Sequence, residues 1–309
     1  MRWSALSMVG SPLDQMNVGI LHFMAYPQCM CGEGPIVETV ASIADDLFFD
    51  HIELTQMKSP LVRSQVHEIV EASRIAASFG AQPIILGGNL DLNHPDRMER
   101  HRAVKAVQWG IEQARELSCD SVTVLSGPVT EDRKEAKERL VDSLKRLCAY
   151  GSPRGIQIRL ETFDQVAYGK NGLIGPTEDA VEVSEEVRKE YSDFGIVVDL
   201  SHLPLMDETA KKALDVARDH LVHVHIGNCA MDNPQHPAYG DNHPRFGASG
   251  TRNDVPELAE FLRHLLDMGY TSAEHRRPVC FEVKPMPGER PESVIAGSKR
   301  ALLAAWRMV

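Results

Sequence analysis

The sequence lacks the features that mark membrane-spanning, secreted and nucleic-acid-binding proteins. No apolar run in its 309 residues approaches the ~18 residues of a transmembrane helix. There is no extended run of Lys or Arg, and the formal net charge is −11. A nucleic-acid or anionic-membrane partner therefore has no electrostatic support. The N-terminal segment MRWSALSMVGSPLDQMN has neither a long apolar core nor a clear cleavage site. We therefore do not expect a signal peptide.

Cysteine pairs of the metal-binding kind are also missing. The six cysteines are scattered, none forms a Cys-x-x-Cys pair, and two lie in strand-like segments. The one cluster, Cys29-Met30-Cys31, is better explained by loop thiols than by a metal site. This usage predicts reduced thiols and a cytoplasmic protein.

What the sequence does contain is a strict alternation of short apolar runs and long amphipathic segments. Alternation of this kind predicts parallel strands joined by crossover helices. The strand-like runs are 18–23, 51–54, 82–86, 121–125, 156–161, 195–199, 221–226 and 278–283. The helix-like segments are 36–48, 61–79, 97–117, 132–150, 177–191, 207–219, 255–268 and 291–309.

Eight such units favour an α/β fold with a single (β/α)8 barrel over residues 1–309. The alternative, an open doubly wound sheet, would be expected to carry a phosphate-binding fingerprint after its first strand. No GxGxxG or GxxxxGK is present. No linker or low-complexity stretch divides the chain, so we expect one domain.

Residues that bind metals end four consecutive predicted strands. In a (β/α)8 barrel the carboxyl ends of the strands form one ring, and the loops there carry the chemistry. The four residues are Glu161, Asp199, His225 and Glu282. Three carboxylates at one mouth would repel one another unless a cation held them. An oxygen-rich set with one imidazole suits Mn²⁺, Mg²⁺ or Co²⁺. We therefore predict a divalent-metal site, with a purely structural salt-bridge network as the alternative.

These positions resemble those of the xylose-isomerase-like barrels, a superfamily of sugar isomerases, sugar epimerases and endonuclease IV-type enzymes. The shared features are a Glu ending the fifth strand, Asp-x-x-His after the sixth, His-x-His in the seventh and a Glu ending the eighth. The resemblance extends over residues 18–309. It implies that Glu161 and Glu282 bind the metal and also act as the acid/base pair. It implies that Asp199 and His225 complete the metal shell and that His202 is a catalytic residue contacting the substrate's oxygens.

The chemistry of such a site favours a metal-dependent sugar isomerase or epimerase, with manganese as the expected ion. A metal that bridges a carbonyl and an adjacent hydroxyl acidifies the C–H bond between them and stabilises an enediolate. One carboxylate then removes the proton, and another group returns it. Lys284 lies two residues after Glu282, on the same strand face, and could stabilise the same oxyanion. A surface lysine is the alternative.

A long segment rich in Gly, Pro, Asn and His, residues 227–254, follows the seventh strand. A loop of this length in a compact domain is usually a lid or a binding loop. It contains Asp241, His243 and Arg245, in a stretch that resembles the segment supplying further metal ligands in endonuclease IV-type enzymes. Those enzymes also use histidines from the second and third strands, where this chain offers Glu53 and a Gly-Gly-Asn turn. We therefore expect Asp241 and His243 to bind substrate or to support the metal ligands rather than to hold a second metal, and Arg245 to bind substrate.

Two residues from the first strands complete the predicted site. His22 and Glu53 are candidates for substrate binding at the barrel mouth, although core or loop-anchoring roles explain them equally well. We expect the ligand to be a sugar or sugar derivative. We also expect a homo-oligomer.

Other activities are compatible with the same residues. A metal and base could act as a lyase on an oxidised sugar, deprotonating beside a 3-keto group and expelling an aglycone. The opening LHFMAYP…GEGPIVET resembles the large subunit of bacterial C-glycoside deglycosidases, which pair with a small second subunit. An abasic-site nuclease is disfavoured by the missing histidines and the acidic charge. A binding barrel without activity is the remaining alternative.

Overall fold

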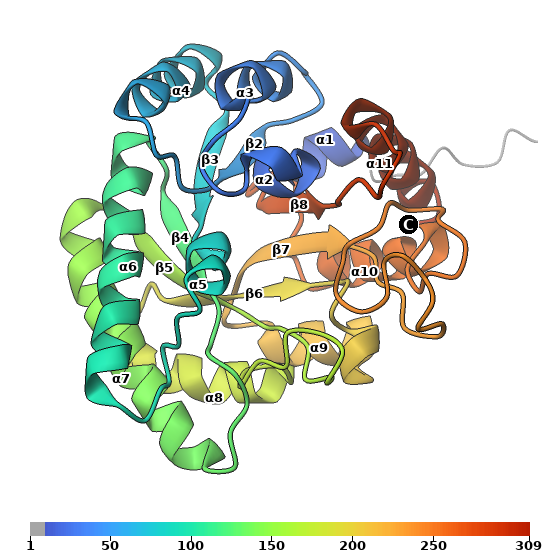
Figure 1. Cartoon of the computed structure of the whole chain (residues 1–309). Helices are drawn as coiled ribbons and strands as arrows, with labels where there is room; N and C mark the ends of the chain where they lie inside the picture. The colour runs from blue at the N-terminus through green and yellow to red at the C-terminus, as the bar shows by residue number, and fades with distance from the viewer. Residues whose placement is uncertain (1–9) are drawn as a thin grey trace, which may run out of the picture.

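The computed structural model describes residues 10–309. The first nine residues, part of the segment that we do not expect to be a signal peptide, lie outside the described residues. Eight parallel strands close into a barrel in chain order (Figure 1), and β1 pairs with β8. The (β/α)8 barrel is thereby confirmed. The strands are β1 (Asn17–Leu21), β2 (His51–Leu54), β3 (Ala76–Gly80), β4 (Ser121–Val124), β5 (Gln157–Glu161), β6 (Gly195–Asp199), β7 (Leu221–Gly227) and β8 (Pro278–Glu282).

Long helices surround the strands, with α6 and α7 on one side of the barrel and α10 and α11 on the other (Figure 1). These helices are α3 (Ile36–Ala44), α4 (Pro60–Ser73), α6 (Arg97–Glu116), α7 (Arg133–Gly151), α8 (Thr177–Arg188), α9 (Ala210–Ala217), α10 (Val255–Asp267) and α11 (Pro291–Trp306). Short helices are α1 (Pro12–Gln15), α2 (His22–Ala25), α5 (Gln82–Gly87), η1 (Pro27–Cys29), η2 (Ser152–Arg154) and η3 (Pro204–Met206).

Several helices begin at side chains that satisfy their free N–H groups. The Asp96 carboxylate accepts hydrogen bonds from the backbone N–H of Met98 and Glu99 at the start of α6. Asp254 and Glu257 form a capping box at the start of α10. The long loop after β7 therefore ends at a defined residue.

The prediction for the third strand was wrong. Residues 76–80 form β3, whereas the predicted strand 82–86 falls within helix α5, and α4 ends at Ser73. Pro83 suits the first turn of α5, where a missing N–H costs nothing. The segment AASFG has no β-branched residue, yet it forms a parallel ladder with β2, in which Glu53 aligns with Ser78. Strand preference reflects packing against neighbouring strands more than intrinsic propensity.

Alternating side chains along each strand separate an apolar shell from a polar barrel interior. Residues that point outward, such as Ile52, Phe79 and Val224, are fully buried in the main hydrophobic core. Residues that point inward are mostly polar and also buried, among them His51, Glu53, Ser78, Arg159, His223 and His225. The interior is therefore a stack of polar groups that continues up to the carboxyl ends of the strands.

Two general properties complete the description of the chain. Within residues 10–309, no helix combines the length and the apolarity needed to cross a membrane. All six cysteines lie in this part of the chain, and none forms a disulfide. Five are buried and Cys31 is exposed.

Candidate active site

Three of the four predicted metal ligands converge at the carboxyl ends of β5, β7 and β8. His225 Nδ1 lies 2.8 Å from Glu161 Oε1 and 2.9 Å from Glu282 Oε2. Each of the three residues offers one ligand atom, and these atoms all lie within 4.8 Å of one another. All three side chains are buried. Strand ends that are far apart in sequence thus form one compact donor set.

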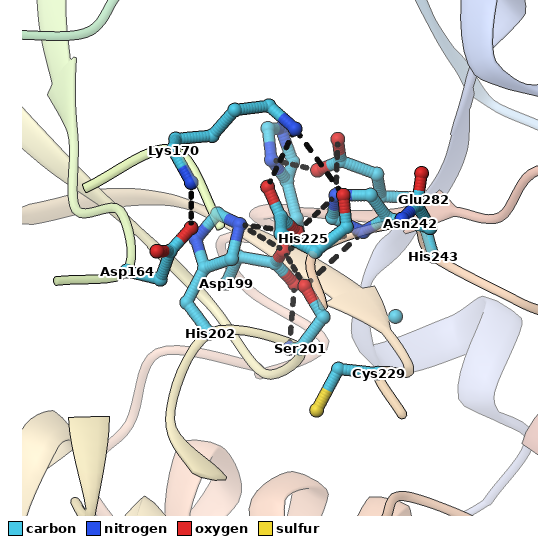
Figure 2. A network of polar contacts seen from close by, with 12 residues as sticks. Asp164, Lys170, Asp199, Ser201, His202, His225, Cys229, Asn242, His243 and Glu282 are labelled. Carbon is cyan, nitrogen blue, oxygen red and sulfur yellow. Dashed lines mark hydrogen bonds and ion pairs between the residues drawn. The ribbon is translucent and has the colours of Figure 1, made fainter. Parts of the chain in front are cut away.

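Asp199 at the end of β6 lies in an adjoining group rather than within this set. It groups with His202 and His243, whose ligand atoms lie within 4.8 Å of one another. Its Oδ2 accepts a hydrogen bond from Ser201 Oγ and lies 3.5 Å from His202 Nε2. The two groups meet where His243 Nε2 approaches Glu282 Oε1 at 3.4 Å (Figure 2).

The carboxylates strongly favour protonation of the neighbouring imidazoles. Burial lowers the pKa of His225, but Glu161 and Glu53 outweigh it and hold this pKa well above its usual value. Burial also lowers the pKa of His243, and Glu282 and Asp241 reverse the effect and raise it to about 9. Carboxylates that stabilise a protonated imidazole in this way would also attract a metal cation.

Asp241, in the loop after β7, contacts both His202 and His243. Its Oδ1 lies 3.2 Å from His202 Nε2 and 2.8 Å from His243 Nε2. Burial raises the pKa of Asp241, but His243 and His202 outweigh burial and hold it well below its usual range. The backbone N–H of Lys284 donates to the carbonyl of His243 at 2.7 Å, which ties the long loop to the end of β8.

A cavity of about 500 Å³ opens above these groups. Its polar part contains Gln82, Asp241, His243, Glu282 and Lys284. Its apolar part comes from α2, α5 and the neighbouring loops and contains Phe23, Met24, Met30, Ile84, Leu86 and Phe163. A concave site with a few convergent polar groups and an apolar wall is typical of small-molecule binding.

A comparison with protein families identifies the class of barrel. The model of the xylose isomerase-like TIM barrel family matches residues 42–302. The chain belongs to this family. The resemblance drawn from the strand-end residues is thereby confirmed at the level of the superfamily.

Solved structures with the same fold extend over almost the whole chain. A D-tagatose 3-epimerase-like protein has a TM-score of 0.71 and 20% sequence identity, covering 95% of this chain and 98% of its own. An L-ribulose 3-epimerase has a TM-score of 0.70 and 14% identity, covering 94% and 96%. A 3-keto-D-glucoside 4-epimerase from E. coli has a TM-score of 0.65 and 18% identity, covering 95% and 99%. Among curated proteins, none matches this sequence.

The xylose isomerase-like barrel brings three of the six predicted substrate residues, Asp241, His243 and Lys284, to the cavity wall. The other three do not line it. His22 Nε2 lies 2.8 Å from Thr39 Oγ1, next to α3, and burial lowers the His22 pKa to about 4. Glu53 is fully buried below the donor set, inside the barrel.

Arg245 is the third predicted substrate residue that does not line the cavity. Its Nε pairs with Glu289 Oε1 at 2.7 Å and it borders a separate surface hollow beside α11. His202, predicted as catalytic, is also outside the cavity wall. It is 1% exposed, and its Nδ1 lies 2.7 Å from the carbonyl of Thr162. Asp241, which His202 contacts, lines the cavity, whereas His202 itself does not.

Gln82 and Lys170 are among the residues at the site that were not predicted. Gln82 Nε2 donates to Glu161 Oε2 at 2.7 Å, and a correct placement of β3 would have shown Gln82 two residues after its end. Lys170, in the loop after β5, lines the cavity and lies 3.3 Å from Asp241 Oδ2. No periodic pattern marks Lys170, because irregular loops have none.

Proposed function

We propose that this protein is a divalent-metal-dependent epimerase or isomerase of sugars. Glu161, Asp199, His225 and Glu282 hold the ion, and manganese is the expected metal. The observation that carries the proposal is the convergence of ligand atoms from β5, β7 and β8 within 4.8 Å at the barrel mouth. The sugar epimerases among the solved structures of the same fold support it.

The donor set fits a hard or borderline divalent ion. Together with Asp199 from the adjoining group, the set offers three carboxylates and one imidazole, which such ions prefer. Glu282 Oε2 is buried without a hydrogen bond, although it lies only 2.9 Å from His225 Nδ1. A buried, unpaired carboxylate oxygen is costly unless a cation satisfies it. When bound, the ion would polarise a carbonyl and acidify the neighbouring C–H bond.

In this proposal Glu161 and Glu282 exchange the proton with the sugar carbon. Burial raises the pKa of Glu161 above its usual value, although His225 opposes the shift. A carboxylate with a raised pKa is a better proton carrier near neutral pH. Gln82 orients Glu161 through its hydrogen bond to Oε2. His202 acts through Asp241, whose carboxylate it holds at the cavity wall.

Solvent exchange tests this proposal. Ketohexoses and ketopentoses are incubated in D₂O with the manganese-loaded protein, and the products are followed by NMR. We expect interconversion of two sugars, with deuterium appearing at the reacting carbon beside the carbonyl. Conversion without deuterium would point to a hydride shift and overturn the enediolate chemistry. Cleavage of DNA at abasic sites, with no sugar turnover, would establish the nuclease instead.

The apolar wall of the cavity favours a second candidate, a lyase that acts on a 3-oxo-glycoside. A free sugar presents hydroxyl groups on all sides, and burying them against Met24, Ile84 and Leu86 leaves their hydrogen bonds unmade. A glycoside with an aromatic aglycone would place its apolar part there. Release of free aglycone from such a 3-oxo-glycoside, measured by absorbance, distinguishes the lyase from the epimerase. In the lyase case we propose a small second subunit as partner, and otherwise a homo-oligomer.

A further inference from the structure

Inside the barrel, next to His225, N–H and O–H groups from two strands, β3 and β7, face one buried carboxylate. Glu53 on β2 is fully buried. Its Oε2 accepts a hydrogen bond from Ser78 Oγ at 3.2 Å and lies 3.4 Å from His225 Nε2. The same oxygen lies 3.6 Å from His223 Nε2. Glu53 therefore contacts the face of His225 opposite to Glu161 and Glu282.

The partners of these donors define which nitrogens carry protons. Arg159 Nη1 lies 3.1 Å from His223 Nδ1, and a guanidinium group can only donate. His223 Nδ1 is therefore the acceptor, and the ring proton is on Nε2, which faces Glu53. Ser78 donates its hydroxyl proton to Glu53, so it accepts from His51 Nε2 at 2.8 Å. The Ser78 hydroxyl therefore donates to Glu53, and the His223 N–H faces the same oxygen at 3.6 Å without a hydrogen bond.

The same reasoning applies to His225. A neutral imidazole has one N–H donor and one acceptor nitrogen. Carboxylates lie on both sides of the ring, Glu53 at Nε2 and Glu161 and Glu282 at Nδ1. When an ion takes the Nδ1 side, Glu53 is the acceptor that keeps the N–H at Nε2. The lone pair is then on Nδ1, which lies between Glu161 and Glu282 at 2.8 and 2.9 Å. This is the nitrogen that can bind a metal ion.

We propose that Glu53 is a positioning residue that fixes the tautomer and ring orientation of His225, so that Nδ1 is available to the metal. The inference rests on the proposed function, because it assumes an ion in the donor set. Carboxylates that orient metal-binding histidines in this way typically contribute about 10–100-fold to metal affinity. Glu53 would act through His225 and would not touch the substrate.

The alternative is that Glu53, His223 and His225 hold a second ion themselves, since their ligand atoms lie within 4.8 Å. Two features oppose it. His223 Nε2 carries the ring proton and has no lone pair to offer. Arg159, whose Nη1 lies 3.1 Å from the same ring, places a positive charge beside the position that a cation would occupy. We therefore expect one ion per chain.

Manganese binding by purified protein tests the inference without any substrate. The concentration of free Mn²⁺ is read from its electron paramagnetic resonance signal during titration of wild-type protein and of Glu53→Gln. Gln keeps the size of the side chain and removes the charge. We expect one ion per chain in both, with Kd about 10–100-fold higher in the variant. Ser78→Ala is the matched control, because it leaves the contact between Glu53 and His225 in place, and its Kd should stay within about threefold of wild type.

Each outcome separates the two hypotheses. If wild-type protein binds no Mn²⁺, the proposed function fails. If wild type binds it and Glu53→Gln binds equally well, the positioning role is excluded, whatever the melting temperature does. Loss of a second ion in the variant would make Glu53 a ligand and overturn the inference. Should Glu53→Gln not fold, Glu53→Asp retains the charge but withdraws it from His225, and an unchanged Kd would again exclude the role.

Discussion

Gln82 Nε2 donates a hydrogen bond to Glu161 Oε2 across 2.7 Å, although 79 residues separate the two in sequence. The contact joins the first residue of α5 to the last residue of β5. It holds one carboxylate oxygen of Glu161 while the other faces His225 at 2.8 Å. Gln82 also lines the cavity, so this single amide borders both the proposed base and the substrate space.

Replacing Gln82 with Leu should slow turnover and leave metal binding largely intact. The substitution keeps the size of the side chain and removes the donor to Glu161. A hydrogen bond to a charged group contributes about 1.5–3 kcal/mol, so kcat should fall on the order of tenfold to a hundredfold. Steady-state kinetics with saturating Mn²⁺ measures the change. An unaffected kcat would mean that the amide serves only to anchor α5.

Conservative changes of the proposed ligands should remove the metal. Glu161→Gln, Asp199→Asn and Glu282→Gln should each raise the Kd for Mn²⁺ by about 100-fold or more, because each deletes an anionic donor. A crystal soaked in Mn²⁺ should show ligand atoms at about 2.0–2.4 Å from one ion. Lys284→Met, at the cavity wall, is the control and should bind normally. If Asp199→Asn also binds normally, the ion uses only the three-residue group.

Asp241→Asn should destabilise the protein far more than the loss of its lysine partner. The substitution leaves His202 and His243 buried without their shared carboxylate, and breaking a buried pair costs about 3–5 kcal/mol. Lys170 is partly exposed, so Lys170→Met should cost less than about 1 kcal/mol. Urea denaturation of the metal-free proteins compares the two. Equal losses would show that Lys170, rather than the histidines, holds Asp241.

Acid should destabilise the protein through His22. Burial lowers its pKa to about 4, from a usual value of 6.5. Above pH 6.5 the imidazole is neutral in both states and full stability is present. Between these two values the unfolded chain binds a proton that the folded chain does not, so the free energy of unfolding falls as pH falls. The gap corresponds to about 3 kcal/mol.

The His22→Gln variant isolates this contribution. Gln can retain a hydrogen bond to Thr39 and has no proton to bind in this range. Urea denaturation with a chelator present, at about pH 7.5 and at about pH 4.5, gives the loss for each protein. We expect the variant to lose about 3 kcal/mol less than wild type. Identical losses would assign the acid sensitivity to other buried groups.

The sequence by itself determined the class of fold and the residues that end the strands. Seven strands lie where apolar runs predict them, because a strand buried between two layers must be apolar on its outer face. Glu161, His225 and Glu282 could then be assigned to one mouth, since all strands of a closed parallel barrel end on the same side. That inference needs only the order of the strands and the two-residue period of their side chains.

Tertiary structure alone decided the position of β3 and the direction of the loop side chains. AASFG becomes a strand because β2 and β4 lie on either side of it, and no local pattern carries that information. Within one loop, Asp241 and His243 turn to the donor set while Arg245 turns to Glu289. Glu53 faces His225 across the barrel interior because β2 and β7, which are not neighbours in the closed sheet, both direct these side chains inward. These contacts join residues far apart in sequence, so only the closed barrel specifies them.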